Sequence, residues 1–276
     1  MPSPRVPIVE TILKAWADAF RAIAAMPVVA LCALVILAVV GVVAWWISVA
    51  VLLNPGRTVL EWLASPTWFV LFLVNTSLQI VLLAPLSIAV QRFVIRRDNA
   101  RRYPLNPLRP SYLNYVGVAL AINLAFRLPD LMRVLAPYVL DLSVWIEIGI
   151  WLLTLALMIA VLIVALRRIA LFAAIAVNAP NATWRGIAPA DAGNTFRIVL
   201  IVLAIWLPGA VYGFLVNTYF PMPRSPYMGG VVLALLIWLP QLPIIGAFAA
   251  ASARIFMALE TPATTTATRD ESVAVA

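Results

Sequence analysis

Histidine is missing from the 276 residues of this chain, and cysteine occurs once, as Cys32. Without histidine the protein has no imidazole general base, no His-ligated metal and no haem held by an axial histidine. A lone cysteine cannot form an intrachain disulfide or a metal-binding cysteine cluster. We therefore expect no metal and no cofactor. Cys32 lies inside an apolar run, and we interpret it as a packing residue.

Charged side chains are also scarce, because only 11% of the residues are charged while 64% are hydrophobic. A soluble domain has about 25% charged residues and about half apolar ones. This chain has too little polar surface to cover itself in water, so we expect a membrane protein. It lacks the motifs of a nucleophile elbow, a phosphate-binding loop and a zinc protease. We therefore expect no enzyme, assign no catalytic residue, and name no nucleic acid as a partner.

Long uncharged runs set the expected topology. A helix rises about 1.5 Å per residue, so about 20 apolar residues cross the hydrocarbon core of a bilayer. The runs predict an all-α polytopic bundle of six transmembrane helices in a single domain, residues 1–260. The expected spans are about 27–53, 67–92, 111–127, 141–167, 197–217 and 229–255. The third span is the shortest, and Asn114 and Asn123 dilute it.

The segments around these spans give further expectations. Residues 7–25 predict an amphipathic helix in the cytoplasmic membrane interface. Its apolar side is Ile8, Ile12, Trp16, Phe20 and Ile23, and its charged side is Glu10, Lys14, Asp18 and Arg21. The run from Pro27 is too long for a signal peptide. We expect 169–177 to continue in the cytoplasm or lie in the interface, and 261–276 to be a disordered cytoplasmic tail.

Basic residues divide unevenly between the two sides of this topology. The termini and the loops 92–110 and 167–197 hold 15 of the 19, and the other three loops hold 4. The positive-inside rule therefore predicts that both termini are cytoplasmic. Arginine supplies 18 of the 19 basic residues, which together with the high alanine content is typical of a GC-rich bacterial coding sequence. We expect a multi-pass protein of the bacterial cytoplasmic (inner) membrane.

The densest group of arginines follows the second expected span. Its members are Arg92, Arg96, Arg97, Arg101, Arg102 and Arg109. The group is first a cytoplasmic anchor, and it is also a candidate site for membrane lipids, anionic ones in particular, or for a membrane-protein partner. A pattern Ala-x-x-Arg recurs at Ala89, Ala165 and Ala251, where each returning helix ends. Arginines at helix C-termini complement the helix dipole, so the recurrence fits either three repeated hairpins or convergence.

A second candidate site is a polar path through the membrane, formed by Asn75, Gln79, Glu147 and Gln241. Pro240 and Pro243 flank Gln241 and leave the carbonyls of Leu236 and Leu239 without helical donors. Freed carbonyls beside an amide are a feature of discontinuous transporter helices. Glu147 is also expected to form a structural ion pair with Arg127 or Arg133.

Four stretches together resemble a known group of proteins. They are the amphipathic N-terminus, "LSIAVQRFVIRRD" from Leu86, "RRIALFAAIAV" from Arg167 and "AGNTFRIVL" from Ala192. They resemble a group of six-helix bacterial membrane proteins of unassigned function, which are similar to the membrane domain of glycerophosphoryl diester phosphodiesterases. The resemblance implies the architecture only. The catalytic barrel of that family has no counterpart in this sequence, so its activity does not carry over.

Two functions follow from these features. The favoured one is a non-catalytic membrane component that binds lipid or a partner protein through its basic cytoplasmic face. The alternative is a transporter or channel-like protein for a small solute, which uses the polar, proline-broken second, fifth and sixth spans. A cavity lined by Gln79 and Gln241 would favour transport, and a solid apolar centre would favour the membrane component.

Overall fold

The computed structural model describes residues 5–52, 66–103, 106, 108–139, 144–180, 182–186, 192–219, 232 and 235–274. Its helices are α1 (Ile8–Ala25), α2 (Pro27–Leu52), α4 (Pro66–Arg96), α5 (Pro110–Val139), α6 (Val144–Arg167), α7 (Ile169–Ala176), α8 (Ala192–Tyr219) and α10 (Gln241–Ala274). No strand occurs within those ranges, so the predicted all-α class is confirmed for them.

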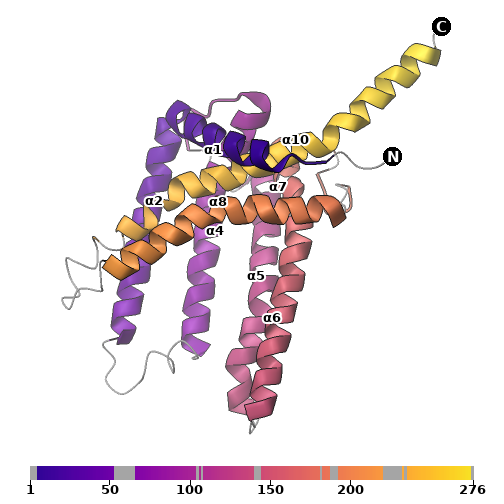
Figure 1. The fold of residues 1–276 in the computed structure, drawn as a ribbon. Helices are drawn as coiled ribbons and strands as arrows, with labels where there is room; N and C mark the ends of the chain where they lie inside the picture. The colour runs from indigo at the N-terminus through magenta and orange to yellow at the C-terminus, as the bar shows by residue number, and fades with distance from the viewer. Residues whose placement is uncertain are drawn as a thin grey trace.

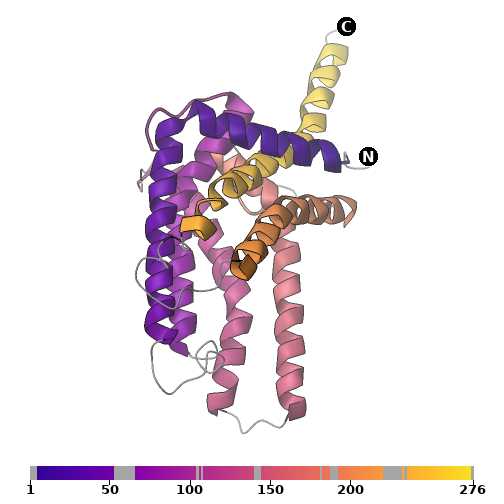
Figure 2. The ribbon, with the colours of Figure 1, turned by 60° about the vertical axis from the view of Figure 1, so that its left-hand side comes forward.

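Four helices, α2, α4, α5 and α6, stand side by side and alternate in direction (Figures 1 and 2). The end of α4 and the start of α5 therefore lie at one end of the molecule. Helix α1 lies across that end, and we call it the α1 end. Both termini are on this side of the molecule in Figure 1.

Helices α8 and α10 run across the other four in both views (Figures 1 and 2). They pack on each other and on α1, and Gly209 of α8 marks the close approach. A Cβ atom added there would lie 2.5 Å from Cδ1 of Ile244 on α10. These two helices therefore do not stand parallel to the other four.

Five helices of the described ranges are long and apolar enough to cross a membrane. The qualifying segments are Pro27–Ala44, Phe69–Arg96, Trp145–Arg167, Gly193–Val216 and Leu235–Leu259. Helix α5, which contains the expected span 111–127, is not among them. It has ample length, with 30 residues. The protein is thus a helical membrane protein with five candidate spanning helices in the described part of the chain, and the sixth expected span, 111–127, stays a prediction.

The outer helix α6 supports this conclusion by its exposure. Its apolar side chains face outward along most of its length, and Trp145 is 81% exposed. A soluble protein rarely leaves so large an apolar surface uncovered, whereas lipid chains cover it without cost. Thr154 is an exception, because it is buried and donates a hydrogen bond to the carbonyl of Pro129 on α5, at 3.4 Å.

Helix α1 packs on α10 through a face that differs from the apolar side predicted from the sequence. Its buried residues are Thr11, Ala15, Asp18, Ala19 and Ala22. These side chains are mostly small, and they meet Gly246 of α10, where an added Cβ would lie 3.3 Å from Cβ of Ala19. Small residues allow two helix backbones to approach closely. Phe20, a member of the predicted apolar side, is 56% exposed.

Two other segments complete the arrangement of helices. Helix α7 is too short to cross, as predicted, and it is buried against α4, α5 and α10. The segment predicted as a disordered tail continues α10 to Ala274 and projects away from the other helices (Figure 1).

Candidate functional site

The arginine group divides into two parts in the structure. Arg92 and Arg96 lie in the last turns of α4 and donate hydrogen bonds to the end of α7. The Arg92 Nε atom donates to the carbonyl of Ala176 at 2.6 Å, and Arg96 Nη2 donates to the carbonyl of Val177. Two of the six predicted lipid-binding arginines therefore have a partner inside the protein.

The way in which α7 ends explains these two bonds. Asn178 adopts a left-handed backbone with φ of 52°, which terminates the helix. The N–H groups of Asn178 and Ala179 then return to the carbonyls of Ile175 and Ala174, at 3.1 and 2.9 Å, as in a Schellman motif. The next two carbonyls, those of Ala176 and Val177, receive no donor from this motif. Arg92 and Arg96 supply the donors and place positive charge at the negative end of the helix.

The other four arginines, Arg97, Arg101, Arg102 and Arg109, are exposed at the α1 end. Arg97 ends α4 in a left-handed conformation with φ of 57°. The segment after it is held by Tyr103, whose hydroxyl donates to the carbonyl of Leu82 at 2.5 Å. Burial raises the pKa of Tyr103, so the phenol stays protonated and able to donate. A fixed anchor thus holds a solvent-exposed basic segment.

Tyrosine hydroxyls also satisfy carbonyls that prolines leave without donors. Pro85 in α4 removes the helical donor of Val81, and Tyr112 donates to that carbonyl at 2.8 Å. Pro240 does the same to Leu236, whose carbonyl accepts from Tyr212 of α8 at 2.8 Å. The carbonyl of Leu239 accepts from the N–H of Leu242 at 3.2 Å. The carbonyls predicted to be free are therefore used in packing, and they are not open to a solute.

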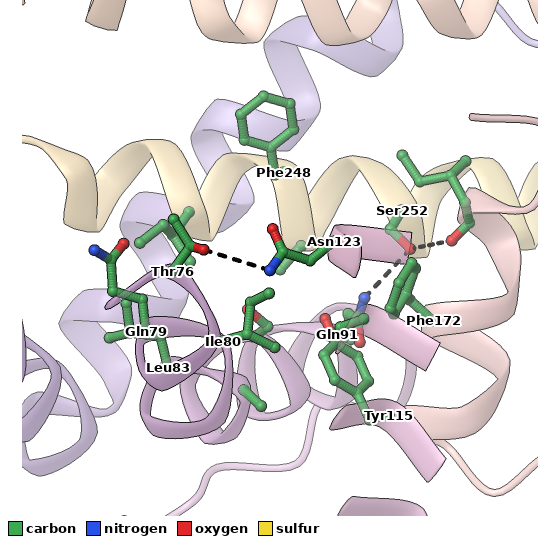
Figure 3. A pocket seen from close by; sticks show the side chains of 16 residues that line it. Thr76, Gln79, Ile80, Leu83, Gln91, Tyr115, Asn123, Phe172, Phe248 and Ser252 are labelled. Atoms are coloured by element: carbon green, nitrogen blue, oxygen red, sulfur yellow. Dashed lines mark hydrogen bonds between the residues drawn. The ribbon is translucent and has the colours of Figure 1, made fainter. Parts of the chain in front are cut away.

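A cavity of about 480 Å³ lies between α4, α5, α7 and α10 (Figure 3). We call it the Gln91 cavity. Polar side chains occur among apolar ones in its wall, and the apolar ones include Ile80, Leu83 and Phe248. The polar lining residues are Thr76, Gln79, Ser87, Gln91, Tyr115, Asn123 and Ser252. Only Gln79 among them belongs to the path predicted from the sequence.

The other members of that predicted path lie elsewhere. Asn75 and Gln241 do not line the Gln91 cavity, and Glu147 is exposed in the first turn of α6. The structure thus does not bring these four residues together. Arg127 pairs with Asp130 at 3.4 Å rather than in the predicted pair with Glu147, and its guanidinium lies 4.4 Å from the ring centre of Phe72. The Arg133 side chain lies outside the described part of the structure.

Sequence reasoning missed most of the cavity lining. Thr76, Ile80, Leu83, Ser87 and Gln91 follow each other at steps of four, three, four and four, so they form one face of α4. A polar residue at each end of such a face, within an uncharged run, was the available signal. The facing residues on α5 and α10 carry no comparable signal, because only the packing of the helices brings them there.

Inside the cavity, Gln91, Ser252 and Ile169 form a chain of hydrogen bonds (Figure 3). The Ser252 hydroxyl donates to the carbonyl of Ile169 at 2.8 Å and accepts from Gln91 Nε2 at 3.2 Å. Gln91 is 1% exposed, and its Oε1 atom has no hydrogen-bond partner in the described part of the chain. Buried polar atoms normally have partners, so this acceptor is unusual.

Each of the three arginines of the recurring Ala-x-x-Arg pattern has its own contact. Arg92 binds the end of α7, and Arg168 lies 5.1 Å from the ring centre of Trp184. Arg254 of α10 binds Asp18 of α1, from Nε to Oδ2, at 2.8 Å. The three contacts differ in chemistry, so they stabilise different junctions at the α1 end. Among the described residues no three His, Cys, Asp or Glu side chains gather to hold a metal ion.

No protein-family profile, no curated protein and no solved structure matches this chain. The function is therefore inferred from the chain's own geometry.

Proposed function

We propose that the protein is a non-catalytic, multi-pass component of the bacterial inner membrane that binds anionic lipid headgroups at its α1 end. Both termini are cytoplasmic in this proposal. The observation that supports it is the group of four exposed arginines, Arg97, Arg101, Arg102 and Arg109, on an anchored segment. Arg92 and Arg96 are not part of the binding group, because they hold the end of α7.

Electrostatics give the expected strength of this binding. A basic residue near an anionic leaflet contributes about 1 kcal/mol. Exposed charges act within about 8–10 Å at physiological salt, so lipids directly beneath the segment contribute most. An acidic loop of a membrane-protein partner is the other candidate for the same charges.

The experiment compares the full-length protein with Arg97, Arg101 and Arg102 changed together to Gln or to Lys. Each protein is purified in mild detergent, and the lipids that remain bound are measured by mass spectrometry. We expect the Gln variant to bind anionic lipid more weakly, by roughly 3 kcal/mol of binding free energy. The Lys variant should keep most of that binding free energy. Unchanged anionic lipid in the Gln variant would reduce the group to an orientation signal. Co-purified proteins, identified in the same samples, report on the partner alternative.

Transport of a small solute is a second candidate, because the Gln91 cavity includes Gln79. Only part of the expected polar path is present there, since Gln241 does not line the cavity. Proteoliposome swelling with glycerol, urea and small sugars tests this candidate. Solute-dependent swelling that is lost in Gln79→Leu would support it. The resemblance to six-helix bacterial membrane proteins is compatible with both candidates and remains a proposal.

A further inference from the structure

The Gln91 cavity is long, and its two ends differ. Thr76 and Gln91 both line it and lie fifteen positions apart on α4, which corresponds to about 22 Å along the helix axis. Between them the wall is mainly apolar, with Ile80, Leu83 and Phe248 (Figure 3). A volume of about 480 Å³ spread along such a length makes a narrow cleft. It has the form of a site for an extended molecule rather than a compact one.

Among the described residues, no charged side chain lines this cleft, and its polar groups are amides and hydroxyls. A buried ion needs an opposite charge or several good hydrogen bonds to offset its desolvation. The cleft has no cation for a carboxylate or phosphate and no anion for an amine. Its chemistry selects a neutral ligand.

At the opposite end of the cavity, the Thr76 hydroxyl is already satisfied by protein groups. The Thr76 hydroxyl donates to the carbonyl of Phe72 at 3.0 Å and accepts from Asn123 Nδ2 at 3.4 Å. A ligand gains little by bringing a polar group to Thr76, because its hydroxyl already donates to one protein group and accepts from another.

The Gln91 end differs because one acceptor is left over. The single hydroxyl proton of Ser252 goes to the carbonyl of Ile169, so Ser252 can only accept from the Gln91 amide. This fixes Nε2 toward Ser252, the Tyr115 hydroxyl lies against the same side chain, and Oε1 is the atom without a partner among the described residues. A buried acceptor without a donor is destabilising, and a hydroxyl brought by a ligand would supply that donor.

From these features we propose that the Gln91 cavity binds a neutral, single-chain lipid whose head carries a hydroxyl group. The hydroxyl donates to Gln91 Oε1, and the chain extends along α4 toward Thr76. The ligand enters from the bilayer, because α4 and α10 both contain segments apolar enough to lie within it. This site is separate from the basic segment of the α1 end, and neither proposal rests on the other.

The test uses the full-length protein in nanodiscs and a photoreactive long-chain fatty alcohol, with the fatty acid of equal length as comparison. After irradiation at pH 8, intact-protein mass spectrometry measures labelling, and digestion locates it. We expect labels on α4, α5 or α10, with the alcohol labelling at least about tenfold more than the ionised acid. Equal labelling by alcohol and acid, or labels confined to α6, would overturn the proposal.

Two variants distinguish the cavity from general lipid contact. Ala119 lines the cavity, whereas Ala121 on the same helix is exposed and lines an outer groove against α6. Ala119→Phe should reduce alcohol labelling about tenfold, and Ala121→Phe should leave it unchanged. Equal effects of the two substitutions would mean that the label does not report the cavity.

Gln91→Leu provides a test that does not depend on filling the cavity. It replaces the amide, both the Oε1 acceptor and the Nε2 donor, with an apolar side chain of similar size. The wild type should favour the alcohol over a photoreactive alkane of equal length by about fivefold to tenfold, as one buried hydrogen bond predicts. In Gln91→Leu the two probes should label equally. A preference that persists in the variant would refute the assigned role of Gln91.

Discussion

Arg254 and Asp18 lie 236 positions apart in the sequence and form the ion pair that joins α10 to α1. The distance from Arg254 Nε to Asp18 Oδ2 is 2.8 Å, and Nη2 of the same guanidinium contacts the same oxygen. Asp18 is 1% exposed, and the other oxygen, Oδ1, lies 3.7 Å from the exposed Arg21. A buried carboxylate depends on such a partner, because it has lost its hydration.

The first prediction concerns this pair. Arg254→Gln or Asp18→Asn should each destabilise the protein by about 3–5 kcal/mol, because each leaves a buried group without its partner. The double variant should be less destabilised than the two single effects added together, since it leaves no unpaired charge. Thermal unfolding in detergent, followed by tryptophan fluorescence, gives the comparison. Lys14→Gln is the control, because the Glu10–Lys14 pair is exposed and should be nearly neutral. Strictly additive effects would contradict the pairing.

The sequence predicts only part of the contact between Asp18 and Arg254. Spacing correctly related Asp18 to Arg21, and it identified Arg254 as the last arginine of a recurring helix end. It could not relate Asp18 to Arg254, because their proximity depends on how α1 crosses α10. Spacing also assigned Asp18 to the charged, outward side, whereas small neighbours such as Ala15 and Ala19 allow α10 to cover it.

The candidate sites, too, could be predicted only in part from the sequence. Composition was sufficient for the helical class and the membrane environment, because both depend on runs of local residues. Proline chemistry correctly identified the Leu236 carbonyl as one without a helical donor. The identity of its partner, Tyr212, required the packing of α8. Gln79 was recognised, but the facing Asn123 and Ser252 belong to helices whose positions the sequence does not give.

The second prediction separates two arginines of one group by their roles. Arg92→Gln should lower the free energy of unfolding by about 1–3 kcal/mol, because it leaves the carbonyl of Ala176 without its donor. Arg101→Gln should change it by less than about 0.5 kcal/mol, because the side chain is exposed. Lipid binding should follow the reverse order. The two unfolding temperatures and the bound anionic lipid are measured on the same samples. Equal destabilisation by both variants would be inconsistent with the observed contacts.

The third prediction concerns Tyr103, which anchors the basic segment. Tyr103→Phe should expose the bonds after Arg101 and Arg102 to trypsin at pH 8, because the hydrogen bond to Leu82 is lost. Since the folded pKa of this phenol is raised, its stabilising effect is complete below the unfolded pKa of about 10 and is lost as the pH rises through the folded value. Thermal unfolding between pH 9 and 11.5 should therefore fall less steeply in Tyr103→Phe. Identical pH profiles would show that Tyr103 does not supply this dependence.

The fourth prediction uses a glycine at a close contact. A Cβ atom at Gly41 of α2 would lie 2.5 Å from Cδ1 and 2.7 Å from Cγ of the Trp238 ring. The ring is rigid, so Gly41→Ala should destabilise the protein by about 1–3 kcal/mol through overpacking. Gly117→Ala on α5 is the matched control, because no atom lies within 4 Å of its added Cβ. The control should be neutral or slightly stabilising, since alanine favours helix. If both variants melted alike, Trp238 would not be packed against α2 as described.

The fifth prediction tests how many times the chain crosses the bilayer. Reporter fusions after Arg102 and Gly186 should be cytoplasmic, and fusions after Pro55 and Arg133 periplasmic. The informative position is Pro223, which, like Pro55, lies outside the described residues. The Gly193–Val216 segment of α8 has 24 residues and would extend about 36 Å, more than the roughly 30 Å of the hydrocarbon core. We therefore expect α8 to cross with tilt, which makes the fusion after Pro223 periplasmic.

A cytoplasmic reading for the fusion after Pro223 would indicate a different topology. Helices α8 and α10 run across α2, α4, α5 and α6 in Figures 1 and 2. If that orientation persists in the bilayer, the chain enters along α8 and returns along α10 on the same side. A cytoplasmic reading after Pro223, together with a periplasmic one after Arg133, would then give four complete crossings and a re-entrant pair. Both termini would stay cytoplasmic in either case, so this fusion separates the two topologies while the others verify the orientation.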